Sequence, residues 1–78
     1  MAEADLMDRE RILDVRSLQP PEPMLKVLDT LETLPDGQIL RMIHNREPFP
    51  LYAALQELGF RHRLDLETVE RIDILIWR

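Results

Sequence analysis

The residues of this sequence that could do chemistry are few, and cysteine is not among them. The 78 positions hold two histidines, 15 acidic residues and 10 basic residues. Without a thiol, the chain has no thiol nucleophile, persulfide carrier, thiolate metal site or redox switch. Ser17 lacks the strained, glycine-flanked turn of a nucleophilic serine, and Glu22 has no nucleophile or second carboxylate beside it in the sequence. We therefore expect no catalytic residues, no cofactor and no enzymatic activity.

The side chains that could bind a ligand follow two predicted strands. Ligands of open α/β sheets bind beyond the carboxyl ends of the strands, where helix N-termini also offer amides and a positive dipole end. Arginine at such an edge can bind a carboxylate through two hydrogen bonds. Prolines 21 and 23 each remove one amide from the first helix, which weakens an anion site, and an ordinary polar edge remains an alternative. The candidate ligand residues are Arg16, Ser17, Glu22, His44, Asn45 and Arg46.

The two histidines stand in different sequence surroundings. His44 could bind a metal, transfer a proton or anchor its loop by hydrogen bonds, and we favour the anchor because no second ligand lies at metal-binding spacing. His62 stands between Arg61 and Arg63 on a predicted strand, which favours a structural or surface role. A shared metal site would need the fold to bring both rings together with carboxylates. We expect no metal site.

Hydrophobic periodicity predicts the elements that position these residues. A strand at 12–16 precedes a helix at 21–34, which begins in prolines suited to a first helical turn. Strands follow at 38–43, 60–66 and 71–77, and a second helix spans 50–58, with Gly59 as its left-handed stop. Right-handed crossovers would place both helices on one face of the sheet. The expected fold is a two-layer α/β sandwich, β-α-β-α-β-β, with a four-stranded mixed sheet at 11–78 after a flexible acidic segment at 1–10.

The last predicted strand suggests a second functional surface. Alternate residues of a strand point to opposite faces. The row expected to face the helices is Ile72, Ile74 and Ile76, and the row expected on the open face is Asp73, Leu75 and Trp77. An exposed apolar patch of this kind usually marks an interface. The alternative is that the N-terminal segment, with Leu6 and Met7, folds over this face.

Two segments carry a resemblance to a known family. Residues 13–23, LDVRSLQPPEP, resemble the opening motif of the TusA/SirA-like proteins, leucine-aspartate-x-arginine-glycine-leucine-x-cysteine-proline-x-proline. Pro20 stands at the position of the cysteine, Ser17 replaces the glycine, and Pro21 and Pro23 match the two prolines.

Residues 44–60 look like a cysteine-free sister group, a bacterial family of unknown function. The resemblance implies the TusA-like fold and a bacterial cytosolic setting. Some members of the sister group are associated with haemerythrin-like domains or nitrogen-oxide metabolism. Sulfur-carrier activity is not implied, because the reactive cysteine is missing.

Charge and hydropathy exclude several partners. The net charge of −5 disfavours nucleic acid, since binding it depends on neutralising phosphates. No signal peptide or stretch of about 18 apolar residues occurs, so we expect no membrane association and a cytoplasmic location.

The favoured function is a non-catalytic binding module that engages a protein partner or itself through the open sheet face. The alternative is a domain that binds a small anion or a metal or redox cofactor around Arg16, His44 and Arg46, accessory to sulfur or nitrogen-oxide metabolism.

Overall fold

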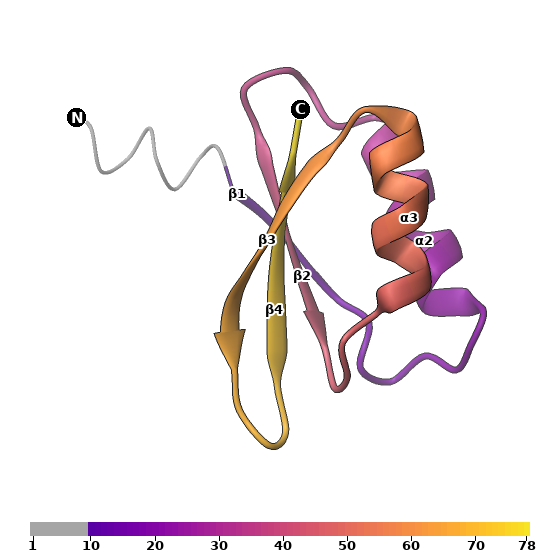
Figure 1. The fold of residues 1–78 in the computed structure, drawn as a ribbon, viewed down its shortest axis with the longest axis vertical. Coiled ribbons are helices and arrows are strands. Elements are labelled where there is room, and N and C mark those ends of the chain that lie inside the picture. The colour runs from indigo at the N-terminus through magenta and orange to yellow at the C-terminus, as the bar shows by residue number, and fades with distance from the viewer. Residues whose placement is uncertain (1–9) are drawn as a thin grey trace.

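The protein folds into two layers with the predicted order of elements (Figure 1). The structure, a computed structural model, describes residues 10–78. Its elements are β1 (Glu10–Asp14), α2 (Glu22–Glu32), β2 (Ile39–His44), α3 (Phe49–Leu58), β3 (Arg61–Glu67) and β4 (Ile72–Trp77). Most of the expected acidic segment at 1–10 lies outside the described residues, and Glu10 is the first residue of β1. Leu6 and Met7, the expected alternative cover of the sheet, also lie outside them.

The four strands form one mixed sheet in the order β1-β2-β4-β3. Strand β1 runs parallel to β2, whereas β4 runs antiparallel to both β2 and β3. Because β4 inserts between β2 and β3, each helix links two strands that run in the same direction. Figure 1 shows both helices on one side of the sheet. The predicted two-layer α/β sandwich is confirmed.

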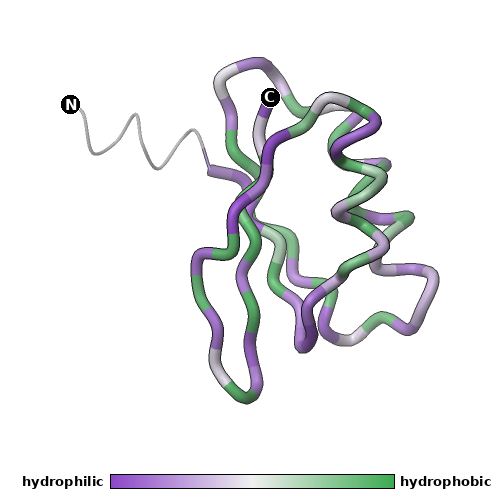
Figure 2. Tube along the Cα trace, viewed as in Figure 1, coloured by the Kyte–Doolittle hydropathy of each residue, from purple (hydrophilic) through white to green (hydrophobic). Residues whose placement is uncertain are grey.

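The hydrophobic core lies between the helix layer and the sheet. The inward stripe of α2 includes Val27 and Leu31, and α3 contributes Leu51 and Leu55. From the sheet, the predicted row of β4 meets them, together with alternate residues of β2: Leu40, Met42, Ile72, Ile74 and Ile76. Hydrophobic stretches of the chain therefore face one another across the two layers, and the loop after β2 is hydrophilic (Figure 2).

The boundaries of the elements differ from those predicted by a few residues. The most relevant shift concerns His44, which is the last residue of β2 rather than the first residue of a loop. Helix α3 ends as expected, since Gly59 adopts φ 84°. The Phe60 amide donates to the Leu55 carbonyl at 2.9 Å, and the Gly59 amide donates to that of Gln56 at 3.2 Å. This pair of hydrogen bonds is a Schellman motif.

Candidate functional site

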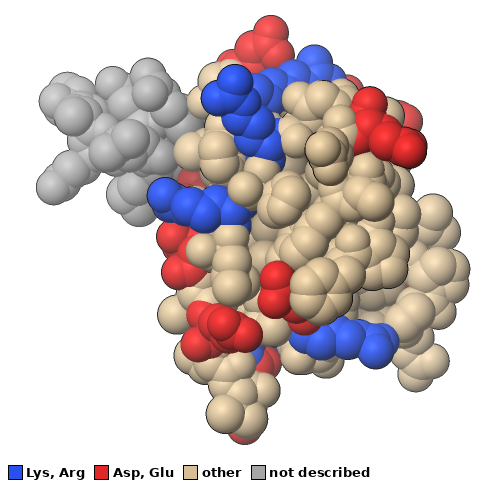
Figure 3. Space-filling view, viewed as in Figure 1, with Lys and Arg blue, Asp and Glu red and all other residues tan. Residues whose placement is uncertain are grey.

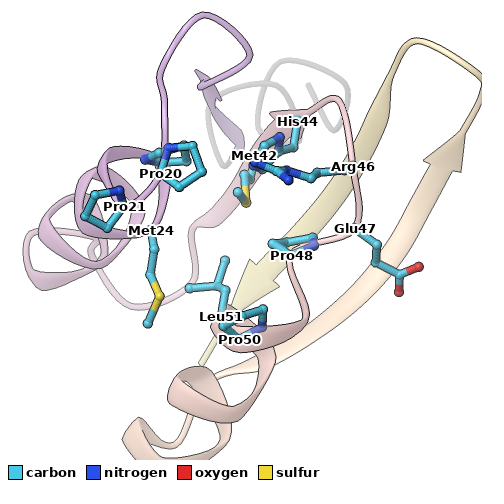
Figure 4. Close-up of a pocket in the computed structure, with 11 residues that line it drawn as sticks. Pro20, Pro21, Met24, Met42, His44, Arg46, Glu47, Pro48, Pro50 and Leu51 are labelled. Carbon is cyan, nitrogen blue, oxygen red and sulfur yellow. The ribbon is translucent and has the colours of Figure 1, made fainter.

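A pocket of about 410 Å³ opens where the carboxyl end of β2 meets the N-termini of both helices (Figure 4). This is the edge at which the sequence predicts a ligand site. Its wall is mainly apolar and is formed by side chains that include Pro20, Pro23, Met24, Met42, Pro48 and Leu51. A volume of this size falls within the range of small-molecule sites. The pocket can therefore accept a ligand with an apolar body.

His44 is the buried polar side chain of the pocket wall. It lies on the helix side of β2 and only 6% of its surface is exposed. The backbone amide of Asn45 donates to its Nδ1 at 2.7 Å, and the side-chain oxygen of Asn45 lies 3.0 Å from the same atom. Because a backbone amide can only donate, Nδ1 acts as an acceptor and Nε2 carries the ring hydrogen. The anchoring role expected for this histidine thus accounts for one of its two nitrogens.

The second nitrogen of His44 has no protein partner. No hydrogen bond joins Nε2 to another of residues 10–78, and no polar side-chain atom of this part of the chain is both sealed from solvent and unpaired. Since the ring lines the pocket, its N–H donor is available to a ligand there. Burial lowers the pKa of His44, and the charge of Arg46 lowers it further, although the contact with Asn45 opposes this shift. The imidazole is therefore neutral near pH 7.

Arg46 places a positive charge at the mouth of the same pocket. Its side chain extends toward Met42 and His44, whereas Glu47 points away from the pocket (Figure 4). Glu47 instead accepts a hydrogen bond from the Tyr52 hydroxyl at 3.1 Å. Among residues 10–78, no carboxylate lies within ion-pair distance of Arg46. The guanidinium is thus free to bind an anion.

The helix N-termini supply few donors to this pocket, because prolines occupy them. In α2, Pro23 lacks an amide hydrogen, the Glu22 amide donates to the Gln19 carbonyl and the Leu25 amide donates to that of Pro21. This leaves the Met24 amide in the first turn. In α3, Pro50 also lacks an amide hydrogen, and the amides at 49, 51 and 52 donate to carbonyls of residues 47 and 48. Neither helix forms the cluster of free amides that typically holds a phosphate.

The remaining predicted ligand residues do not line this pocket. Arg16 is turned back onto the Asp14 carboxylate at 2.7 Å, and this contact lowers the pKa of Asp14 to about 2. Ser17 is exposed in the turn after β1. Glu22 borders a shallow depression on the outer side of α2, beside Lys26. Of the predicted set, His44 and Arg46 therefore line the pocket and Asn45 contacts His44 beside it, whereas the other three lie elsewhere.

The apolar wall was not among the sequence-based candidates. Met24 falls in the helix predicted at 21–34 and Met42 in the strand predicted at 38–43, and neither was a candidate ligand residue. A usable signal was present, since prolines of residues 20–23 and 48–50 stand at the start of both helices. Prolines at two adjacent helix N-termini give a rigid, apolar rim that offers few amides. The sequence does not show that these two segments meet, because this depends on where the fold places the two helices.

His62 lies elsewhere and makes an aromatic contact. Its ring stacks on Tyr52 with centroids 4.3 Å apart and an interplanar angle of 7°. This is consistent with the structural role that we favour for this histidine. Over residues 10–78, no group of three or more histidine, aspartate or glutamate side chains could hold a metal ion.

The predicted interface residues lie on the sheet face opposite the helices, but two of them are not exposed. Asp73 is 0% exposed and Leu75 is 7% exposed, whereas Trp77 is half-buried. The expectation of an exposed patch is thus wrong for Asp73 and Leu75. The neighbours on the adjoining strands explain this burial, because Arg41 and Arg63 are the cross-strand partners of Leu75. The stems of such long side chains cover apolar surface.

A network of ion pairs crosses this sheet face. Arg41 contacts the carboxylates of Glu10, Asp65 and Asp73, and Asp73 also accepts two hydrogen bonds from Arg71 at 2.7 and 2.9 Å. The contacts with Arg71 and Arg41 lower the pKa of Asp73 although burial opposes this shift. Basic and acidic side chains also lie interspersed over the molecular face seen in Figure 3. The buried aspartate is thus a paired, charged side chain.

Fold and pocket together define a small α+β protein with a site of ligand size at the edge of its sheet. The family described as uncharacterized conserved protein (DUF2249) matches residues 12–78. This match spans most of the chain, so the chain belongs to that family. No curated protein and no solved structure matches the chain. The prediction of a family of unknown function is confirmed, while the relation to the TusA proteins and the bacterial origin stay predictions. In the described part, no helix has the length and apolar character needed to cross a membrane.

Proposed function

We propose that this domain is a non-catalytic binding module that takes a small anion in the pocket between α2 and α3. The observation that carries the proposal is the pairing of two free donors. The Nε2 hydrogen of buried His44 and the unpaired guanidinium of Arg46 occupy one end of an otherwise apolar pocket. Because neither donor has a protein partner, a ligand can accept hydrogen bonds from both without breaking an internal one. A bound anion would supply such an acceptor.

The lack of catalysis is part of the proposal. Glu47 is the carboxylate that lines this pocket, and it points away while accepting a hydrogen bond from Tyr52. Burial and this glutamate raise the pKa of Tyr52, so its phenol stays protonated. The described pocket wall therefore holds no nucleophile paired with a base. Donors without such a pair suit binding rather than reaction.

The resemblance to the TusA proteins is compatible with this site. The resemblance places the carrier cysteine of that family at Pro20, and Pro20 lines the pocket. The region around Pro20 would thus bind a ligand non-covalently in this protein, where the TusA proteins carry sulfur covalently. A role accessory to sulfur or nitrogen-oxide metabolism, in the cytoplasm of a bacterium, stays within this proposal.

A titration with simple anions tests the proposed function. Acetate, hexanoate, sulfate and phosphate are added to the folded protein at up to millimolar concentrations while the ring resonances of His44 and the backbone amides are followed by NMR. Saturable shifts confined to the pocket, lost in Arg46→Gln, support the proposal. The matched control is Arg16→Gln, because Arg16 is an exposed arginine outside the pocket. The absence of saturable shifts with all four anions overturns the proposal.

The sheet face remains a second candidate, as a site for a protein partner or for self-association. The observation in its favour is that Ile12, on this face of β1, is 63% exposed, and Trp77 is partly exposed. Light scattering after gel filtration tests self-association directly. A concentration-dependent dimer that is lost in Ile12→Asp supports it. A strict monomer across the micromolar range rules it out.

A further inference from the structure

We infer that the ligand of this pocket is a small apolar monocarboxylate, with its carboxylate at Arg46 and His44 and its hydrocarbon chain toward Met24 and Leu51. This inference rests on the proposed function and names the chemical class of the anion. It follows from three features of the pocket: which donors it has, which it lacks and where its apolar wall lies.

The donors present match a planar anion. Arg46 offers a rigid fork of N–H groups, which pairs with the two oxygens of a carboxylate. His44 adds one N–H donor from the buried wall, because its Nδ1 is occupied by the Asn45 amide. Both side chains line the pocket, and Figure 4 shows the Arg46 side chain extending toward His44. Two oxygens can thus be satisfied by these two side chains.

The donors that are missing argue against phosphate and sulfate. Such anions carry more oxygens and are usually held by several free backbone amides at a helix N-terminus. Here Pro23 and Pro50 remove amide hydrogens from the first turns of α2 and α3, and carbonyls of the same turns accept most of the others. At most the Met24 amide remains in α2. A tetrahedral anion would therefore lose more hydrogen bonds to water than this pocket can replace.

The apolar wall lies at the other end of the pocket. Met24, Leu51 and Pro50 line the end opposite His44 and Arg46, between the two helices (Figure 4). A ligand that places its charge at Arg46 would extend its body over this wall. Each methylene that is buried there adds about 0.8 kcal/mol, which is close to a four-fold gain in affinity. Short hydrophilic anions such as acetate would forgo this gain.

A series of ligands tests the assignment by isothermal titration calorimetry and NMR. Acetate, butyrate and hexanoate should bind with affinities that rise about four-fold per added methylene. Hexan-1-ol has the same chain without the charge and should bind at least ten-fold more weakly than hexanoate. Inorganic phosphate should produce no saturable shift. Arg46→Gln should weaken hexanoate at least ten-fold, as expected for a hydrogen bond to a charged group, and leave hexan-1-ol unchanged.

The possible failures are distinguishable. If no anion binds, the proposed function fails and this inference fails with it. If phosphate or sulfate binds as tightly as hexanoate, or if affinity does not depend on chain length, the anion-binding function stands and the carboxylate assignment is overturned. A peptide with an apolar last residue offers the same chemistry from another source. If it binds far more tightly than hexanoate, and its amidated form does not bind, the pocket serves a protein terminus and not a free acid.

Discussion

At the scale of single residues, two polar side chains are buried among residues 10–78, and their hydrogen bonding differs. Asp73 is satisfied on the sheet face by Arg41 and Arg71, which hold its charged carboxylate. His44 is satisfied on one ring nitrogen alone, by the amide of Asn45. The Asp73 network thus contributes to the stability of the fold, whereas the free Nε2 donor of His44 is the one that our proposed function uses.

The pKa of His44 should be measurably lower than that of a free histidine. Burial disfavours the charged ring, and Arg46 adds repulsion, so the titration midpoint should fall below 6.5. The folded state then binds fewer protons than the unfolded state. The contribution of His44 to the free energy of unfolding should be fully present above pH 6.5 and should decrease as the pH falls below it. NMR titration of the ring measures the midpoint, and His44→Gln should lose this part of the pH profile. A midpoint above 6.5 would contradict the neutral ring.

Asp73→Asn should destabilise the protein by about 3 kcal/mol, because it leaves two arginines facing a neutral group at a buried site. Asp14→Asn is the matched control, since Asp14 pairs with Arg16 but is 44% exposed, and it should cost under about 1 kcal/mol. Urea unfolding measures both. The lowered pKa of Asp73 also means that its contribution is present above the ordinary value of 3.8 and is lost as the pH falls through the folded value. Equal effects of the two substitutions would show that the network adds nothing.

At the scale of elements, the ends of the two helices have separate roles. Their N-termini carry the prolines that shape the pocket, and the C-terminus of α3 carries the Gly59 stop that returns the chain to β3. The strand that follows must start at this point for β3 to pair with β4 in the observed register. The turn at Gly59 therefore affects the sheet as well as the helix.

Gly59→Ala should lower stability by about 1 kcal/mol, because a side chain disfavours the left-handed backbone. A Cβ atom at this position would meet nothing within 4 Å, so steric clash adds no cost. Gly59→Asn should cost less than Gly59→Ala, since asparagine tolerates this conformation better. Thermal unfolding of both variants ranks them. An alanine variant as stable as the parent would contradict the conformational argument.

At the scale of the whole molecule, a single hydrophobic core lies between the helix layer and the sheet. A chain of 78 residues without disulfides has limited buried surface with which to offset its conformational entropy. Core side chains from every layer meet in one cluster, which joins α2, α3, β2 and β4. The layers therefore cannot unfold independently without exposing the same residues.

Unfolding should be a single transition in which sheet and helices are lost together. Trp77 is the only tryptophan and lies at the end of β4, so its fluorescence reports on the sheet. Far-ultraviolet circular dichroism reports chiefly on α2 and α3. The two urea curves should have the same midpoint and slope. A helix signal that disappears before the fluorescence changes would show that the helix layer is a separate unit.

Much of the architecture was determined by the sequence alone. The inward row of Ile72, Ile74 and Ile76 and the Gly59 stop depend on neighbours in the chain, and both were confirmed. Of the candidate site, His44 and Arg46 were predicted because they follow a strand and lie at the edge where ligands bind. A family of unknown function was predicted from motifs that are also local in sequence, and the match over residues 12–78 confirms it.

Other properties were decided only by the tertiary structure. Arg16 was expected at the ligand edge, but the pocket forms where the end of β2 meets the N-termini of α2 and α3, so Arg16 after β1 does not line it. Asp73 and Leu75 were expected on an exposed face, but arginines from neighbouring strands cover them. The apolar wall of the pocket likewise combines prolines and methionines that are far apart in the chain. Periodicity determines which side of an element a residue occupies, whereas burial and pairing depend on the side chains that the fold brings from other strands and helices.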